Sequence, residues 1–383
     1  MKLRLLPLVL CVMSCEAKVD PPDSGTGGGS ATGGGGSASG GGGGSTGGGT
    51  ATGGGGSTGG GTGGGASGGG GGGAVTMLSL SEQYPGDVGI ANDSHVLFHS
   101  DFENGMAGWT RYTTDTQRLT VENDGTTAHA GTHFMKSRIT RSQLAVDQYL
   151  TSMAQLDLNT RVPELYWRFY ARFVGTSAKP HHWVRVAAGT PAYESDGLAN
   201  TKPAGNAGFW FDTDLNEDDN FNFYVYWYAM RSGRCNDGST TPGCAGDQGT
   251  TYFYGNNFNY ANQLAIPRDA WFCVELHAKA NTLGDSNGEL TLWKNDALMA
   301  DYRTGNPRGR WLRDNFYSWG QYFLDLGPFD GFDFRTDADV LLKRVTLDAY
   351  YERGTLPASA PEEQVILYDD VVVATTRIGC RTP

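Results

Sequence analysis

Two histidines and an arginine lie close together in a spacing that suits acid–base chemistry. The segment KPHHWVRV, residues 179–186, places His181 and His182 just before an apolar run that includes Arg185. Histidine titrates nearest neutral pH, so either ring suits a general base, and an arginine suits the neutralisation of a carboxylate. The alternative is an exposed loop with one hydrogen-bonded histidine and no chemistry.

Two segments alternate between apolar and chemically active side chains. Successive residues of a strand point to opposite faces, so each alternating row shares one face. In ELYWRFYARF (164–173) and NFNFYVYWYAM (220–230) one row is apolar, and the other comprises Tyr166, Arg168, Tyr170 and Arg172, and Asn222, Tyr224, Tyr226 and Tyr228. Aromatic planes pack on sugar rings and arginine binds carboxylates in a bidentate manner. We expect both rows to line one face that binds an acidic glycan. The alternative is that local acids neutralise the arginines and the tyrosines fill space beneath loops.

Cleavage of a uronate glycan by β-elimination requires a group that neutralises the carboxylate, a base and an acid. The predicted catalytic residues are His181 or His182 as base or neutraliser, Arg168 and Arg185 as neutralisers, and Tyr226 or Tyr252 as acid or base. The predicted substrate-binding residues are Tyr166, Tyr170, Arg172, Tyr224, Tyr228 and Asn256. Glycoside hydrolysis needs two carboxylates beside the bond, and no Glu-x-Asp-x-Glu spacing occurs, which argues against a retaining glucanase.

Acidic residues near both ends of the folded part predict a calcium site. DFENG supplies Asp101 and Glu103, and YDDVV supplies Asp369 and Asp370. If the terminal strands pair, Asp101 or Glu103 meets Asp369 or Asp370, with Asp370 the predicted ligand, and carboxylate oxygens are ligands that calcium prefers. The alternative is that these acids cap turns. No cofactor is required, so any calcium has a structural role.

The start of the chain reads as an export signal. MKLRLLPLVLCVMSC has a basic start and an apolar core too short to span a bilayer, and its end resembles the bacterial lipobox. That resemblance implies that Cys15 becomes a lipidated N-terminus; the alternative is an ordinary signal peptide cut elsewhere. We expect a signal peptide over 1–14, a disordered Gly/Ser/Thr-rich linker over 15–74, which holds more than half of the 58 glycines, and a folded domain over 75–383.

Four further cysteines fit an oxidising compartment. Cys235 and Cys244 bracket a loop of turn formers and are expected to pair, which leaves Cys273 to pair with Cys380. No CxxC or HxxxH spacing supports zinc instead.

The folded part predicts strands almost throughout. At least ten runs of alternating or β-branched residues are separated by turn signals, and the best helix candidate is 141–153. The predicted fold class is therefore all-β, a two-sheet β-sandwich or jelly roll.

Three segments also carry a family resemblance. HSDFENGMAGW, WFCVELHAKANTLGDSNGELTLWKND and LYDDVVVATTRIGC resemble the framework of concanavalin A-like jelly rolls, within which the chain is similar to the alginate- and glucuronan-lyase type over about residues 96–380. The resemblance implies a concave sheet that binds saccharide, with tyrosine and histidine as base and acid. The segment TTYFYGNNFNY departs from the Tyr-Phe-Lys strand of alginate lyases, because Tyr254 stands where that motif has lysine.

The charge of the chain excludes general nucleic-acid binding. The formal net charge is −12, and removal of residues 1–14 takes away Lys2 and Arg4, which gives 27 − 41 = −14. The sequence therefore predicts a monomeric lipoprotein, tethered to the cell envelope at the outer membrane or cell surface, that acts on or binds an anionic polysaccharide. A non-catalytic carbohydrate-binding or adhesion module, or a structural envelope protein, remains the alternative.

Overall fold

The computed structural model describes residues 78–194, 199–215, 220–259, 265–318 and 326–381. All of them belong to one compact unit, Met77–Pro383. The predicted signal peptide, the lipidation site Cys15 and the glycine-rich linker lie outside these residues. Within the described ranges no helix is both long and apolar enough to cross a membrane.

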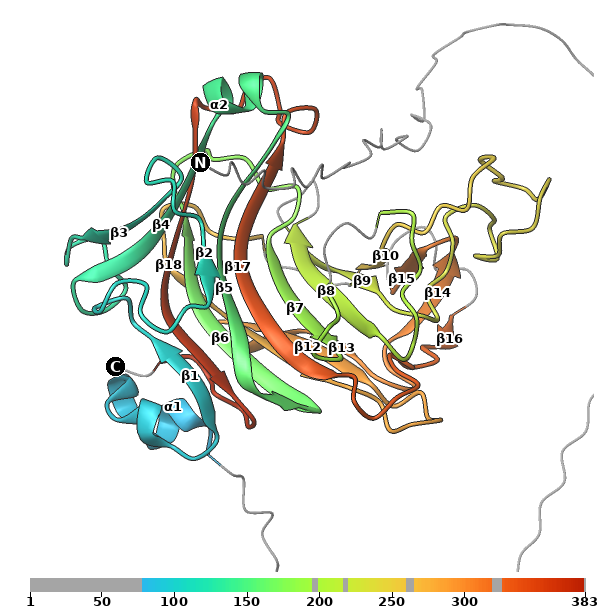
Figure 1. The fold of residues 1–383 in the computed structure, drawn as a ribbon, viewed down its shortest axis with the longest axis horizontal. Helices are drawn as coiled ribbons and strands as arrows, with labels where there is room; N and C mark the ends of the chain where they lie inside the picture. Colours follow the sequence, from blue (N-terminus) through green and yellow to red (C-terminus); the bar gives the residue numbers. More distant parts are fainter. Residues whose placement is uncertain (1–77, 195–198, 216–219, 260–264, 319–325, 382–383) are drawn as a thin grey trace, which may run out of the picture. The chain divides into compact units, whose positions relative to one another are not determined.

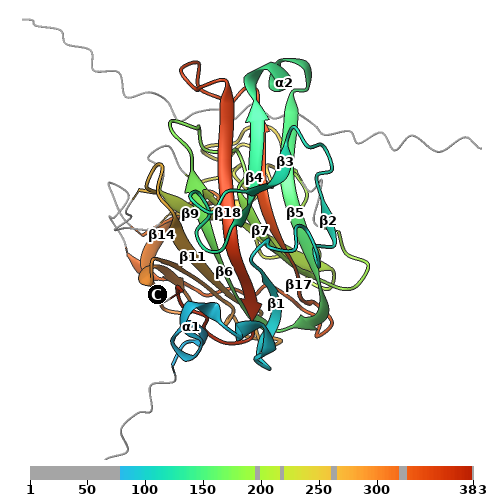
Figure 2. The same cartoon turned by 90° about the vertical axis from the view of Figure 1, so that its left-hand side faces the viewer.

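The first sheet, sheet A, has eight strands. Its order is β13-β12-β11-β6-β18-β4-β3. Strand β1 pairs with the end of β18, beside which it lies in Figure 2. The strands are β1 (Val96–Ser100), β3 (Leu119–Asn123), β4 (His133–Thr140), β6 (Glu164–Phe173), β11 (Phe272–Lys279), β12 (Glu289–Lys294), β13 (Ala297–Tyr302) and β18 (Glu363–Ala374).

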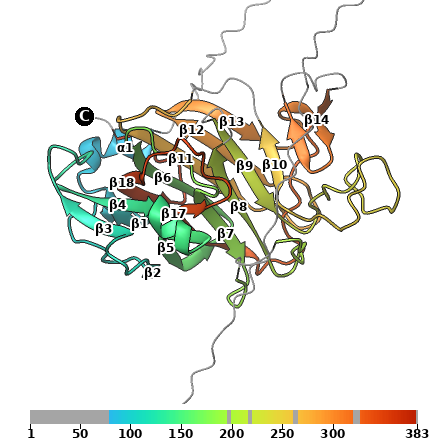
Figure 3. The same cartoon turned by 90° about the horizontal axis from the view of Figure 1, so that it is seen from above.

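The second sheet, sheet B, has ten strands in the order β16-β14-β15-β10-β9-β8-β7-β17-β5-β2. They are β2 (Arg111–Tyr112), β5 (Tyr149–Val162), β7 (Val184–Gly189), β8 (Gly208–Leu215), β9 (Phe221–Tyr226), β10 (Asn256–Asn259), β14 (Arg308–Leu312), β15 (Asn315–Tyr317), β16 (Gly327–Pro328) and β17 (Leu341–Glu352). Figure 1 shows β17, β7, β8 and β9 side by side, and Figure 3 shows the two layers from above.

Helices are few and short. They are α1 (Leu80–Gln83), the 3-10 turns η1 (Pro85–Asp87) and η2 (Ile90–Asn92), and α2 (Arg141–Val146). The predicted helix over 141–153 is wrong beyond Val146. Thr140 starts α2 by accepting a hydrogen bond from the Gln143 amide, but from Tyr149 onward the chain pairs with β17 instead. Pairing along a long neighbouring strand outweighs weak local helix propensity.

The two sheets pack face to face through the apolar rows that the alternation predicted. Trp167, Phe169 and Phe173 of β6 are fully buried, as are Phe211 and Phe223 from sheet B, and all five belong to one core cluster. Burial of each such side chain contributes about 1.5–3 kcal/mol. The fold is a two-sheet jelly-roll β-sandwich, and the predicted fold class is confirmed.

Both predicted disulfides are confirmed. Cys235 and Cys244 close a loop with Cα atoms 5.7 Å apart. Cys273 of β11 joins Cys380 of the C-terminal segment, with Cα atoms 5.9 Å apart.

Candidate functional site

A polar and aromatic row crosses the face of sheet B that is turned away from sheet A, here called the outer face of sheet B. Arg185 of β7 pairs with Asp212 of β8, Asp212 with Tyr224 of β9, and Tyr224 with Asn257 of β10. Residues that face each other across neighbouring strands share one face. The four strands β7, β8, β9 and β10 lie side by side (Figure 1), so these four side chains form one line.

His182 lies just before β7 at one end of this line. Its Nδ1 is 3.0 Å from Asp214 Oδ2 and 3.4 Å from Asp212 Oδ2, and no hydrogen bond involves its Nε2 within the described residues. Burial lowers the pKa of His182, but the charge of Asp214 and the hydrogen bond to it outweigh burial, so the net effect raises that pKa. A histidine held by one nitrogen presents the other for proton transfer.

Arg185 is held in place by an acid and by an aromatic ring. Its Nε and Nη2 donate to Asp212 Oδ1 and Oδ2 at 2.6 and 3.0 Å. The guanidinium carbon lies 4.2 Å from the ring centroid of Trp210, whose ring stacks on Tyr226 at 4.3 Å. A bidentate pair and a cation–π contact fix the orientation of the guanidinium.

Two tyrosines stand beside the histidine. The hydroxyls of Tyr224 and Tyr226 are 3.4 Å apart, and the ring centroid of Tyr224 is 5.2 Å from that of His182. Burial raises the pKa of both phenols above the ordinary value. At neutral pH both hydroxyls therefore keep their protons, and each is suited to donate one.

A carboxyl group on β17 adds a group that exchanges its proton near neutral pH. Asp348 accepts a hydrogen bond from the hydroxyl of Thr151. Burial raises the pKa of Asp348 to about 7, although Thr151 and the positive charge of Arg185 oppose the effect. Asp348 shares the outer face of sheet B, because its neighbours Leu347 and Ala349 belong to the core.

His182, Asp212 and Asp214 are close enough to hold a metal ion, but their atoms are already engaged. One ligand atom from each lies within 4.8 Å of the others. Asp212 binds Arg185 with both oxygens, and Asp214 accepts from the Trp183 amide at 3.0 Å as well as from His182. The trio is therefore better explained as the support of His182 and Arg185 than as a metal site.

The acids predicted to bind calcium are likewise used within the protein. Glu103 accepts hydrogen bonds from Thr132 and His133, and Asp370 is 2.5 Å from His129 Nδ1 and 3.0 Å from Arg381 Nη1. Asp101 accepts from the Glu103 amide at 3.2 Å. Among the described residues, these acids do not form a group of three close ligands. Calcium binding at these acids therefore stays a prediction.

Several predicted site residues do meet on sheet B. His182, Arg185, Tyr224 and Tyr226 form the cluster described above, and the ring of His181 is 4.4 Å from that of His182. Tyr228, just after β9, donates to Asp333 instead. Tyr252 lies in the loop before β10, where its ring contacts Tyr254 at 5.5 Å.

The prediction for Asn256 is wrong. Its side chain is fully buried and bonds both the amide and the carbonyl of Arg231, at 2.7 Å each. The neighbouring Asn257 faces outward, because the residues of β10 alternate and Phe258 faces the core.

The row on β6 is also wrongly placed by the sequence prediction. Strand β6 belongs to sheet A, so Tyr166, Arg168, Tyr170 and Arg172 lie on the outer face of that sheet, away from Tyr224 and Tyr226. Arg168 is fully buried and its Nη2 lies 2.6 Å from Asp87 Oδ2. It cannot meet a substrate carboxylate there.

The two tyrosines of this row hold other segments of the chain. Tyr170 stacks on His129 at 3.6 Å and accepts a hydrogen bond from the Arg381 amide at 2.7 Å. Tyr166 stacks on His277 at 4.4 Å. Alternation shows that side chains share a face, but it does not show which sheet the strand joins.

Sequence reasoning missed Trp210, Asp212, Asp214 and Asp348. The first three alternate with Phe209, Phe211 and Thr213 in GFWFDTDL, which is the same signal that identified the tyrosine row. In VTLDAYY, Asp348 likewise alternates with apolar residues, because it lies between Leu347 and Ala349. Their contribution depends on neighbours from other strands, which no local pattern reveals.

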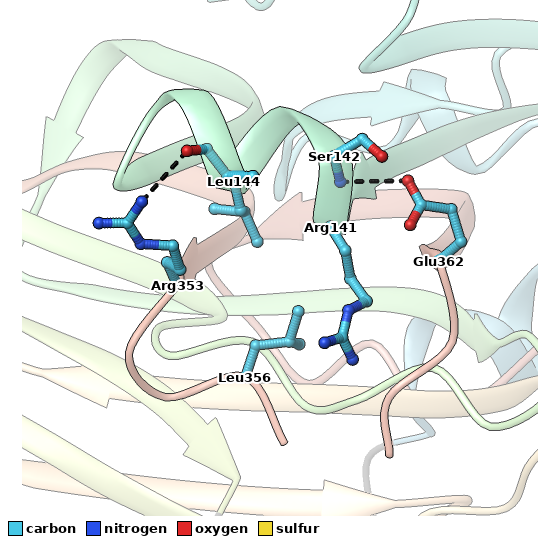
Figure 4. A pocket seen from close by; sticks show the side chains of 7 residues that line it. Arg141, Ser142, Leu144, Arg353, Leu356 and Glu362 are labelled. Carbon is cyan, nitrogen blue, oxygen red and sulfur yellow. Dashed lines mark hydrogen bonds between the residues drawn. The ribbon is translucent and has the colours of Figure 1, made fainter. Parts of the chain in front are cut away.

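A cavity of about 290 Å³ lies elsewhere, beside α2 (Figure 4). Arg141 donates to the carbonyls of Pro357, Ala358 and Ala360, and Glu362 accepts from the Ser142 amide at 3.1 Å. These contacts attach the loop between β17 and β18 to α2, so the polar groups of the cavity have a structural role.

The fold places the protein among the jelly-roll β-sandwiches with a polar row on one outer face. Similar solved structures include alginate lyase vAL-1 from Chlorella virus (12% identity, 73% of this chain and 100% of that chain, TM-score 0.46). Others are the endo-β-1,4-glucuronan lyase of the fungus Trichoderma reesei (14%, 73% and 96%, 0.44) and the marine PL-14 alginate lyase from Aplysia kurodai (10%, 74% and 97%, 0.45). No protein-family model and no curated protein matches the sequence. The function must therefore be argued from the site.

Proposed function

We propose that the protein binds a uronate-containing polysaccharide on the outer face of sheet B and cleaves it by β-elimination. The observation that carries this proposal is that the ring of His182 lies next to the ring of Tyr224. One ring nitrogen of His182 is held by Asp214 at 3.0 Å, and the ring lies 5.2 Å from a phenol that keeps its proton. A positioned base beside a positioned acid is the minimum that an elimination requires.

The reaction assigns one role to each group. Neutral His182 takes the proton from the carbon next to the uronate carboxyl group through Nε2. The electron pair of that C–H bond forms a C=C bond, and the glycosidic C–O bond to the leaving sugar breaks. The Tyr224 hydroxyl gives its proton to the leaving oxygen. Arg185, oriented by Asp212 and Trp210, places positive charge near the developing negative charge.

Hydrolysis is the second candidate, because Asp348 has the property of a general acid. Its raised pKa, about 7, keeps a proton available near neutral pH. Hydrolysis needs a second carboxylate as nucleophile or base. The nearby Asp212 and Asp214 are both engaged, by Arg185 and by His182 with the Trp183 amide. This arrangement favours elimination.

The test is to incubate the full-length protein with alginate, glucuronan and pectate and to follow the ultraviolet absorbance of unsaturated sugar ends. We expect absorbance with at least one polymer, and a loss of about 100-fold or more in rate for His182→Gln and for Tyr224→Phe. His95→Gln is the matched control, because His95 is well exposed and precedes β1 of sheet A.

Each other outcome identifies a different function. Binding without absorbance or new reducing ends would leave a carbohydrate-binding module. New reducing ends without absorbance would indicate hydrolysis and point to Asp348. No binding to any glycan would overturn the proposed function altogether.

We also propose that the protein, as a monomer, is tethered to the cell envelope by a lipid on Cys15. The lipobox resemblance and the glycine-rich linker support the tether. Detergent-phase partitioning of the expressed protein tests the tether. The wild type should enter the detergent phase and Cys15→Ser should not. Equal partitioning of the two would contradict lipidation at this cysteine.

A further inference from the structure

The outer face of sheet B continues beyond Tyr224 onto three more strands. Tyr224 pairs with Asn257 of β10, Asn259 of β10 pairs with Tyr317 of β15, and Tyr317 pairs with Arg310 of β14. Paired residues share a face and alternate residues return to it. Asn259, Tyr317 and Arg310 therefore lie on the same face as Tyr224.

The residues between them confirm this orientation, because they turn to the core. Phe258 and Phe316 are almost completely buried, with ring centroids 6.1 Å apart. Trp311 packs against both of them at 5.3 Å. With these three rings directed inward, the alternation of β10, β15 and β14 directs Asn259, Tyr317 and Arg310 outward.

Arg310 lacks the acidic partner that the two other partly buried or buried arginines near the centre of this face, Arg185 and Arg344, possess. Arg185 is paired with Asp212, and Arg344 with Asp157 and Glu194. Arg310 is partly buried, yet within the described parts of the chain its side chain makes no hydrogen bond or ion pair. A cation that is partly withdrawn from water without a counter-charge favours an anionic ligand.

We propose that Arg310, with Asn259 and Tyr317, forms a subsite that binds a carboxylate of an acidic polysaccharide at a distance from the reacting sugar. The inference rests on the proposed function, which places the reacting unit at His182 and Tyr224. Strand β14 is three strand spacings from β9, which is about 14 Å. The bound glycan must therefore cross several strands and span more than one sugar unit.

The chemistry of the three side chains suits this role. The guanidinium of Arg310 binds a carboxylate with two parallel hydrogen bonds, and the amide of Asn259 can bond sugar hydroxyls. The ring of Tyr317 adds an aromatic surface for the C–H groups of a sugar. Arg310 therefore selects for chain length and for charge.

The experiment measures calorimetric binding of a uronate trimer and a uronate decamer to the full-length protein. All proteins carry His182→Gln, so that the oligomers are not cleaved. Adding Arg310→Gln should weaken decamer binding about tenfold and leave trimer binding within about twofold. Arg310→Lys should retain part of the decamer affinity.

Arg111→Gln is the matched control. Arg111 is exposed on β2 at the opposite edge of the same sheet, so its loss should leave the binding of both oligomers unchanged. A neutral glucan decamer should bind more weakly than the uronate decamer and should not respond to Arg310→Gln.

Decamer affinity that is unchanged by Arg310→Gln would overturn the subsite and leave the proposed function standing. An equal loss of affinity for trimer and decamer in Arg310→Gln would also overturn the subsite. So would tight binding of the neutral glucan decamer that Arg310→Gln weakens to the same extent. If the His182→Gln protein binds neither uronate oligomer, the proposed function fails, and the subsite fails with it.

Discussion

At the scale of single residues, the chemistry of the site depends on what surrounds each titratable group. Asp214 raises the pKa of His182 by its charge and hydrogen bond, whereas burial raises the pKa values of Tyr224 and of Asp348. A base, an acid and a carboxyl that exchanges its proton near pH 7 therefore share one face. The identity of the residues alone would place all of these pKa values elsewhere.

Asp214→Asn should lower the pKa of His182. The substitution removes the charge that stabilises the imidazolium, while the burial that favours neutral imidazole remains. We expect the midpoint of the His182 imidazole signal in an NMR titration to fall. The acid limb of the pH–rate profile should move to lower pH with it. A midpoint equal to that of the wild type would show that Asp214 does not control this histidine.

Asp348→Asn should change the pH dependence of stability. In the folded protein the carboxyl keeps its proton up to about pH 7, whereas its ordinary pKa is 3.8. Between these values the folded state binds more protons than the unfolded state, so this group's contribution to stability is present in acid and is lost as pH rises through 7. As pH rises from 4 to 8, the free energy of unfolding of the variant should therefore rise relative to that of the wild type. The expected difference is about 2 kcal/mol, because the partial exposure of Asp348 reduces the effect.

Urea unfolding at several pH values measures this difference. Asp339→Asn is the control, because Asp339 is exposed and its side chain makes no hydrogen bond within the described residues. A constant offset between Asp348→Asn and the wild type across this pH range would contradict the prediction.

At the scale of strands, position within the sheet decides which alternating row becomes a site. Strands β6 and β9 both alternate tyrosine with core residues, yet only β9 contributes to the cluster around His182. The ring of Tyr224 on β9 also packs directly against the backbone at Gly255. A Cβ atom at Gly255 would lie 2.6 Å from Cζ of Tyr224, closer than van der Waals contact permits.

Gly255→Ala should therefore displace the ring of Tyr224. We expect the elimination rate to fall about tenfold or more, because the acid moves relative to the base, while the melting temperature changes little. Gly354→Ala is the matched control, since a Cβ atom there would meet only Glu352 Oε1, at 3.6 Å. Full activity of Gly255→Ala would show that the position of Tyr224 does not matter.

At the scale of the whole domain, the outer face of sheet A holds both ends of the described chain. Asp87 from η1 pairs with the buried Arg168. From the C-terminal side, the amides of Ile378 and Gly379 donate to Glu275, at 2.7 and 3.0 Å. One sheet thus secures the terminal segments, and the other presents the candidate site.

Asp87→Asn should destabilise the domain strongly. Arg168 is fully buried, so the substitution leaves a charge without its counter-charge, which costs about 3–5 kcal/mol. Asp115→Asn breaks the exposed pair with Arg118 and should cost less than about 1 kcal/mol. Urea unfolding compares the two variants, and equal losses would contradict the structural role of Arg168.

The sequence by itself determined the all-β class, the apolar rows of the core and the Cys235–Cys244 pair, and it left Cys273 and Cys380 as the remaining two cysteines. Period-two alternation and the short spacing of Cys235 and Cys244 are local properties of the chain. It also identified His182, Arg185, Tyr224 and Tyr226 as residues suited to chemistry.

Only the tertiary structure decided which of these residues meet. It assigned β6 to sheet A and so removed Arg168 and Tyr170 from the site, and it added Asp212, Asp214 and Asp348 from β8 and β17. The physical reason is that strand order and register are set by long-range pairing between distant segments, whereas alternation fixes only the side of its own strand on which a residue lies.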